Sequence, residues 1–326
     1  MACFFIPPRF HLPFLFLMKL RHLYAALAGI ALFGLLILMR VTLANSNLQG
    51  DQTVDLPAAP LTTQAELDAF LDEFNFRSGY YLSSHTGGQT IERNSTQSVC
   101  LANMASIFCL TELYRQKHEE NLDLNKSVLI KEGDEATLYQ AAQRMLFASD
   151  NDAMHALAEY LGRDQISKLL RKLDITTVNT PVLPSHKTLT VALNRRLFGR
   201  REAKPGLEQH GSAQGISQFY QLLTQGKVLS PAINAELITF LESQPRDFSL
   251  HLQDSHQLFG QGGNLHWTRP QKHFSMMGWA GYTSLSSGQP VTLCVWGEWF
   301  PRNVKPAEQA RIMQFVVDSL VTIAEQ

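Results

Sequence analysis

An apolar segment near the N-terminus, residues 23–39, constrains this chain more than any other feature of its sequence. It runs for 17 residues without a charged side chain, and Lys19 and Arg21 precede it. That length is at the lower limit for spanning a bilayer and exceeds the apolar core of most signal peptides. Because basic residues stay on the cytoplasmic side, residues 1–22 are predicted to be cytoplasmic and the residues after Arg40 to be exported. We therefore expect a single-pass inner-membrane protein with its folded part in the periplasm.

The processing of this segment is left open by the sequence. Thr42-Leu43-Ala44 suits a signal peptidase, and cleavage there would release a secreted or periplasmic protein. Arg40 interrupts the approach to that site, which favours an uncleaved anchor. Met18 begins a shorter version of the same signal, so the true start is either Met1 or Met18. Residues 40–61 are polar, contain glycine and proline, and are interpreted as a linker.

The composition excludes some classes of function. The chain has 28 basic and 29 acidic residues, a net charge of −1, so it lacks the basic excess that nucleic-acid binding needs. Its four cysteines are too few for a disulfide scaffold, and a Cys100–Cys109 pair is left open. No cysteine or histidine spacing matches a zinc site, so we expect neither metal nor cofactor.

The order of predicted elements indicates an α+β fold over residues 62–326. Thr63 and Glu66 form a capping box that begins a helix, and the β-prone runs 79–83 and 89–93 form a hairpin. Two more strands are predicted at 273–280 and 291–299, and Pro306 begins a closing helix. We expect an antiparallel sheet from the N- and C-terminal strands (62–95 and 256–326), flanked by helices, with an inserted, mostly helical subdomain at 96–255.

Within the predicted helical subdomain, the apolar spacing indicates several helices, and two short segments separate them. Residues 149–151 interrupt the spacing after a helix at 136–147, and Asp164 is predicted to cap another helix. Residues 175–187 are predicted to form a loop, and residues 260–263 a turn. The remaining helices are expected at 104–117, between the 149–151 segment and residue 161, and at 190–198, 212–225 and 230–241.

Ser106, on the first turn of the predicted helix at 104–117, is a candidate nucleophile. Unpaired N–H groups and the helix dipole favour negative charge at such a position. A serine before an apolar run is also a common N-cap, and the residue alone does not decide between the two interpretations.

Three segments resemble the serine β-lactamase and penicillin-binding transpeptidase superfamily, especially class A β-lactamases. They are residues 104–110, residues 146–153 leading to Tyr160-Leu161-Gly162, and residues 121–128. With the order of elements, the resemblance covers about 62–326. It implies a serine nucleophile at Ser106, with the family's lysine one helical turn later replaced by Cys109.

The resemblance also implies a second and a third motif. In the second, Ser149-Asp150-Asn151, Ser149 would relay a proton and Asn151 would hold a substrate carbonyl. The third is Lys-Thr/Ser-Gly on an edge strand. Its best placement is Trp279-Ala280-Gly281, where the lysine and the hydroxyl are missing. The N–H groups of Ser106 and Tyr282 would form an oxyanion hole.

The family's water-activating glutamate is missing as well, because no carboxylate occurs between Asp174 and Glu202. The leading hypothesis is thus an exported β-lactamase-like domain that has lost the standard catalysis. We expect it to act as a binding or scaffolding protein of the cell envelope. Its partner would be a peptidoglycan-like or β-lactam-like small ligand, or an envelope protein. Ser106, Ser149 and Asn151 are then vestigial, and the expected binding residues are Cys109, Trp279, Ala280, Gly281 and Tyr282.

Two alternatives are kept. One is a divergent serine hydrolase in which Ser106 is still acylated or Cys109 is the nucleophile, although Cys109 also suits a small buried apolar position. The other is that Ser106 only caps its helix and Trp279 with its neighbours fills the cleft.

Overall fold

The computed structural model describes residues 54–74, 76–85, 90–175, 177–178, 210–243, 259–269, 272–299 and 304–326. All of them belong to one unit, Gln52–Gln326. The predicted anchor at 23–39 and the predicted helix at 190–198 lie outside these residues. Among the described helices, none combines the length and the apolar character needed to span a bilayer.

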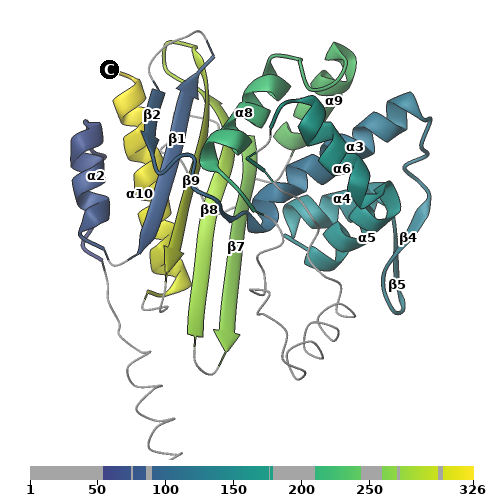
Figure 1. Ribbon diagram of the computed structural model, residues 1–326, viewed down its shortest axis with the longest axis horizontal. Coiled ribbons are helices and arrows are strands. Elements are labelled where there is room, and N and C mark those ends of the chain that lie inside the picture. The colour runs from purple at the N-terminus through teal and green to yellow at the C-terminus, as the bar shows by residue number, and fades with distance from the viewer. Residues whose placement is uncertain are drawn as a thin grey trace, which may run out of the picture. The chain divides into compact units, whose positions relative to one another are not determined.

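A five-stranded antiparallel sheet lies at the centre, with the order β2-β1-β9-β8-β7 (Figure 1). The predicted hairpin and closing strands are confirmed, as is the α+β class. One strand, β7, was not predicted, and the turn expected at 260–263 is wrong because these residues lie in β7 at the sheet edge. The strands are β1 (Arg77–Ser84), β2 (Thr90–Arg93), β7 (Phe259–Arg269), β8 (Lys272–Ser284) and β9 (Pro290–Trp299).

One face of the sheet is covered by α2 (Gln64–Asp72) and α10 (Pro306–Ala324) (Figure 1). Thr63 caps α2 through the predicted capping box, and Pro306 occupies the first turn of α10. Because both helices turn an apolar stripe inward, they bury a core with the strands. Its members include Leu67, Leu71, Trp279, Val295, Trp299, Ile312 and Leu320.

Residues 54–61, interpreted from sequence as part of the linker, are attached to α10. The N–H group of Val54 donates to Oε1 of Glu308 at 2.8 Å, and that of Leu61 to Oγ of Ser319 at 3.0 Å. The folded part of the chain therefore extends back to Val54.

The other face of the sheet carries the helical part, as predicted. Helix α8 packs on β9, β1 and β8, and the remaining helices form a second core. Two short antiparallel pairs accompany them, β3 (Val99–Cys100) with β6 (His210–Gly211) and β4 (Ser127–Lys131) with β5 (Asp134–Thr137). The helices are η1 (Ala102–Ala105), α3 (Ser106–Glu119), α4 (Leu138–Phe147), α5 (Asn151–Leu161), α6 (Arg163–Lys172), α8 (Ala213–Thr224) and α9 (Pro231–Glu242).

One local prediction is wrong, and one cysteine pairing that the sequence left open is absent. Asp164 does not cap α6, because the helix begins at Arg163 after Gly162, whose positive φ of 88° sets the turn. Cys100 and Cys109 do not pair: both are buried thiols, as is Cys294.

Candidate functional site

Ser106 begins α3 directly after η1, so the chain is already helical when it reaches this residue. The N–H group of Ser106 donates to the carbonyl of Asn103. Its side chain is 0% exposed, and its Oγ has no hydrogen-bond partner among the described residues. Ala105 occupies the N-cap position, and no side chain caps the helix. The capping interpretation of Ser106 is therefore wrong, and its buried hydroxyl has no structural partner in this part of the chain.

Cys109 lies one turn further along α3 and is 3% exposed. Burial, with a smaller contribution from the nearby Glu112, raises the pKa of its thiol to about 12. At neutral pH the group is a neutral thiol, so it can neither accept the proton of Ser106 nor supply the positive charge of a lysine. The same protonation makes Cys109 a poor nucleophile.

The Ser149-Asp150-Asn151 segment forms a turn, which we call the Ser149 turn, before α5. Ser149 has a positive φ of 50°, and Oδ1 of Asp150 accepts from the N–H group of Ala153 at 3.1 Å, which caps α5. Asn151 is exposed and Ser149 is half-buried, so both are accessible to a ligand. The sequence predicted this turn, but it did not predict that Asp150 caps α5.

Arg144 of α4 holds the Ser149 turn in place. Its Nε donates to Oδ2 of Asp150 at 2.8 Å, and its two terminal nitrogens donate to both carboxylate oxygens of Asp134 at 2.9 Å. Hydrogen bonds from this guanidinium lower the pKa of Asp134. Bidentate geometry of this kind fixes orientation as well as charge, so Arg144 ties the β4–β5 pair to the turn.

Asn103 joins the first two segments of the site. Its side chain is nearly fully buried, and its Nδ2 donates to the carbonyl oxygen of Ser149 at 3.1 Å. The N-terminal ends of α3 and α5 are thereby held together. Nothing in the local sequence pattern singles out this asparagine.

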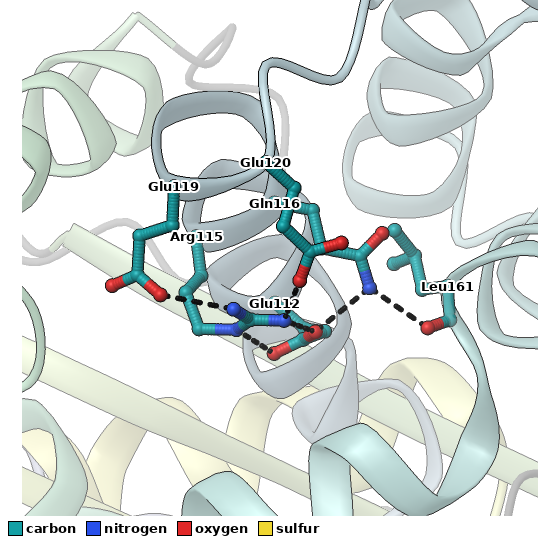
Figure 2. A network of polar contacts seen from close by, with 6 residues as sticks. All are labelled: Glu112, Arg115, Gln116, Glu119, Glu120 and Leu161. Atoms are coloured by element: carbon teal, nitrogen blue, oxygen red, sulfur yellow. Dashed lines mark hydrogen bonds and ion pairs between the residues drawn. The ribbon is translucent and has the colours of Figure 1, made fainter.

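The opposite ends of α3 and α5 are joined as well, through the polar network of Figure 2. Nε2 of Gln116 donates to the carbonyl of Leu161 and to Oε1 of Glu112, each at 2.8 Å. Glu112 is 0% exposed and accepts two hydrogen bonds from Arg115, at 2.6 and 2.8 Å. Arg115 also bonds Glu119 and Glu120, so one guanidinium serves three carboxylates (Figure 2). A buried charge needs such pairing to be tolerated.

The third motif does not lie where the sequence placed it. Trp279-Ala280-Gly281 is on β8, which pairs with β7 on one side and β9 on the other, so its expected edge position is wrong. Trp279 is 5% exposed and packs in the core on the α10 side of the sheet, away from Ser106. An interior strand has its backbone groups engaged on both sides and cannot offer them to a ligand.

Tyr282 also lies on the interior strand β8, so its backbone is paired on both sides as well. It pairs with Phe259 of β7 and Thr292 of β9, and its hydroxyl donates to Oε1 of Glu242 at 3.2 Å. Burial, followed by the charge of Glu242, raises the pKa of the phenol. Because the N–H groups of Ser106 and Tyr282 are both engaged within the protein, the oxyanion hole expected from them is not open in this structure.

The edge strand that does approach the start of α3 is β7. A Cβ atom on Gly263 would lie 2.9 Å from the carbonyl oxygen of Leu101 and 3.1 Å from the N atom of Met104. Only glycine permits this approach, so residues 262–263 form the third segment of the site by position. In the described part of the chain, no group of three or more His, Cys, Asp and Glu residues is placed to hold a metal ion.

Comparisons with known proteins agree with this fold. Residues 62–257 match the family model described as "Beta-lactamase enzyme family". The TLA-1 extended-spectrum β-lactamase superimposes with a TM-score of 0.67 at 11% identity, over 81% of this chain and 98% of that one. A β-lactamase from Chitinophaga pinensis gives 0.65 at 13% identity, over 80% and 98%. PBP-A gives 0.64 at 16% identity, over 83% and 99%. Identities this low show a shared fold alone. No curated protein matches the chain.

Proposed function

Because this chain belongs to the beta-lactamase enzyme family, we propose that it keeps the family's fold as a binding domain and does not carry out serine acyl transfer. One observation carries this proposal: the position one turn after Ser106 holds a buried, protonated Cys109. An alcohol needs a neighbouring base to become a nucleophile, and no such base contacts Ser106 Oγ in the described residues. Loss of one member of a catalytic group removes most of the rate, because the members act together.

The cellular setting of this domain is part of the proposal and rests on the sequence. Residues 23–39 would anchor the protein in the inner membrane, with the β-lactamase domain on the periplasmic side. There it would bind a peptidoglycan-like or β-lactam-like ligand, or scaffold another envelope protein. Protease added to spheroplasts should degrade the domain while leaving cytoplasmic markers intact. Protection of the domain under these conditions would sink the export proposal.

Intact-protein mass spectrometry tests the loss of acyl transfer. The full-length protein is incubated for many hours with benzylpenicillin and, separately, with a fluorophosphonate that labels activated serines. Cooperative thermal unfolding of the same sample shows that it is folded. We expect no mass increase from either reagent, whereas the PBP-A variant whose acyl-enzyme complex with penicillin G has been solved gains the mass of benzylpenicillin when it is treated in parallel.

A divergent serine hydrolase is the second candidate, and the unpartnered Oγ of Ser106 favours it. In that case an adduct forms on the wild type and is absent from Ser106→Ala. The matched control is Ser217→Ala, since Ser217 is another fully buried serine whose Oγ has no partner among the described residues. An adduct that survives in the Ser217 variant but not in the Ser106 variant would overturn the binding-domain proposal.

A further inference from the structure

The β7–β8 pair continues beyond the rest of the sheet (Figure 1). Strand β9 pairs with β8 as far as Ser275, which lies opposite Trp299. Beyond that point β7 and β8 form three further pairs, Trp267–Phe274, Thr268–His273 and Arg269–Lys272. We call residues 267–269 and 272–274 the hairpin extension. Among the described strands, each half of the extension pairs with the other half alone.

The composition of the hairpin extension is aromatic and basic. Trp267 lies opposite Phe274, the adjacent Arg269 lies opposite Lys272, and the extension contains no carboxylate. A cross-strand aromatic pair stabilises a hairpin by itself, so the aromatic pair alone does not indicate a partner. Tryptophan is also enriched where a bilayer meets water, and lysine and arginine are attracted to anionic lipid headgroups. Both kinds of residue together suit the surface of an anionic bilayer.

The point at which the chain enters the domain is an independent observation. The N–H group of Val54 donates to Oε1 of Glu308 in the first turn of α10. The next residue of that turn, Gln309, accepts a buried hydrogen bond at 2.7 Å from Oγ of Ser275. Since the hairpin extension starts directly beside Ser275, the first turn of α10 lies next to both the entry of the chain and the base of the extension.

The length of chain before Val54 connects this end of the domain with the predicted anchor. That anchor ends at Met39, so residues 40–53 join it to Val54. A flexible linker of this length spans about 20 Å on average. The end of the domain that carries the hairpin extension is therefore tethered close to the bilayer if residues 23–39 span it.

We propose that the hairpin extension docks on the anionic phospholipid surface of the membrane that anchors the chain. Trp267 and Phe274 would enter the headgroup region, and Arg269 and Lys272 would pair with lipid phosphates. The domain would then be held at two points, the linker and the hairpin, and would keep one orientation towards the membrane. This inference rests on the proposed anchoring of residues 23–39.

Tryptophan emission tests the proposal in the full-length protein. The protein is reconstituted into vesicles of phosphatidylcholine, brominated high on the acyl chains, with or without phosphatidylglycerol. Bromine quenches a tryptophan only at short range. Of the four tryptophans of the chain, Trp279, Trp296 and Trp299 are at most 5% exposed, so quenching by lipid reports on Trp267. We expect quenching in the anionic vesicles that high salt reverses, because salt screens the attraction between the hairpin and the lipid.

Three variants connect the signal to the hairpin extension. Trp267→Phe keeps an aromatic residue and should abolish the quenching, while the emission of the three buried tryptophans shows that the domain is folded. Lys272→Glu should lower the ratio of docked to undocked protein roughly fivefold or more, because one basic residue near an anionic surface favours binding by about that factor. The matched control is Lys227→Glu, which should leave the ratio unchanged. Lys227 is exposed and follows α8, whose last residue, Thr224, contacts His85 beyond the opposite end of β1.

The outcomes separate the docking of the hairpin from the anchoring of the chain. Absence of quenching in anionic vesicles overturns the proposal, as do equal quenching in neutral vesicles and equal effects of the two lysine variants. Flotation of the protein with the vesicles in high salt reports the anchor independently. A protein that floats without being quenched keeps its anchor and lacks the docking surface. If the protein does not float, the anchoring proposal fails, and quenching at low salt still decides whether the hairpin binds anionic lipid.

Discussion

Asn103 donates a hydrogen bond from its side-chain amide to the carbonyl oxygen of Ser149, 46 residues later in the chain, at 3.1 Å. This bond joins the helix that carries the serine to the turn that carries the second motif. The bond is part-buried, and a hydrogen bond of this kind stabilises the folded state by about 0.5–1.5 kcal/mol.

Asn103→Ala should lower the free energy of unfolding by that amount, because the carbonyl of Ser149 loses its donor. Urea denaturation followed by circular dichroism measures the change. Asn125→Ala is the matched control, since among the described residues the side-chain amide of Asn125 bonds Asp123 within an exposed turn, and it should contribute less than about 0.5 kcal/mol. Equal effects of the two variants would show that the Asn103 bond does not stabilise the site.

Ser106→Ala should leave the stability unchanged or raise it by up to about 1 kcal/mol. A buried hydroxyl without a partner loses its hydration on folding and gains nothing in return. Thr137→Ala removes a real cap, because Thr137 Oγ1 accepts from the N–H group of Gln140 at 3.1 Å, and it should destabilise by about 1 kcal/mol. If the two variants lose similar stability in parallel thermal melts, Ser106 has a structural partner after all.

Arg115→Leu should destabilise the protein by about 3 kcal/mol, because it leaves the fully buried Glu112 without a compensating charge. The double variant Glu112→Leu/Arg115→Leu removes both charges and should recover most of this loss. Chemical denaturation of the three proteins gives the comparison. Arg311→Leu, at an ion pair whose guanidinium is 55% exposed, should cost below about 1 kcal/mol. A double variant as unstable as the single one would mean that packing, and not the buried charge, sets the loss.

The stability should fall as the pH rises from 9 to 10. Burial raises the pKa of Cys109 to about 12 and that of Cys100 to about 11, so both stay protonated in the folded state. The unfolded thiols lose their protons near pH 8.5–9. Above that pH the folded state binds more protons than the unfolded one, and the free energy of unfolding decreases by up to about 1.4 kcal/mol per pH unit for each thiol.

Urea midpoints collected from pH 7 to 10 measure this slope, and Cys109→Ala should reduce it. The range ends at pH 10 because the raised pKa values of buried tyrosines such as Tyr220 add to the slope above it. A slope that Cys109→Ala does not change would show that the thiol of Cys109 remains exposed to solvent in the folded state.

The elements that sequence alone predicted correctly have strong local determinants. The Thr63–Glu66 capping box, Pro231 in the first turn of α9 and Pro306 in the first turn of α10 are each set by a few neighbouring residues. The Ser149 turn belongs with them, because three adjacent residues compete for local backbone bonds.

The edge strand β7 was missed because its determinants are distant. Glycines at 260, 262 and 263 favour a turn over a strand when they are considered locally. Their strand conformation comes from pairing with β8 along the whole of β7, and Gly263 is required by the closeness of Leu101 and Met104. Because β7 was not predicted, the third motif was placed on β8, one strand further into the sheet than the edge strand. The β4–β5 pair was also missed. In the structure it has the features of a hairpin, namely the alternating burial of β4 and the positive φ of Gly133.

The two bonds that tie α3 to α5 have a consequence for cooperativity. Asn103 and Ser149 are 46 residues apart, and Gln116 and Leu161 are 45 apart. Forming either bond closes a loop of that length, and closing the loop lowers the entropy of the chain. Once one bond has closed the loop, the second bond lowers the chain entropy only a little further. The two contacts should therefore form together. A variant lacking both should lose about the sum of the single losses, because the two bonds lie at opposite ends of α3 and the apolar packing of α3 against α5 keeps the loop closed without them.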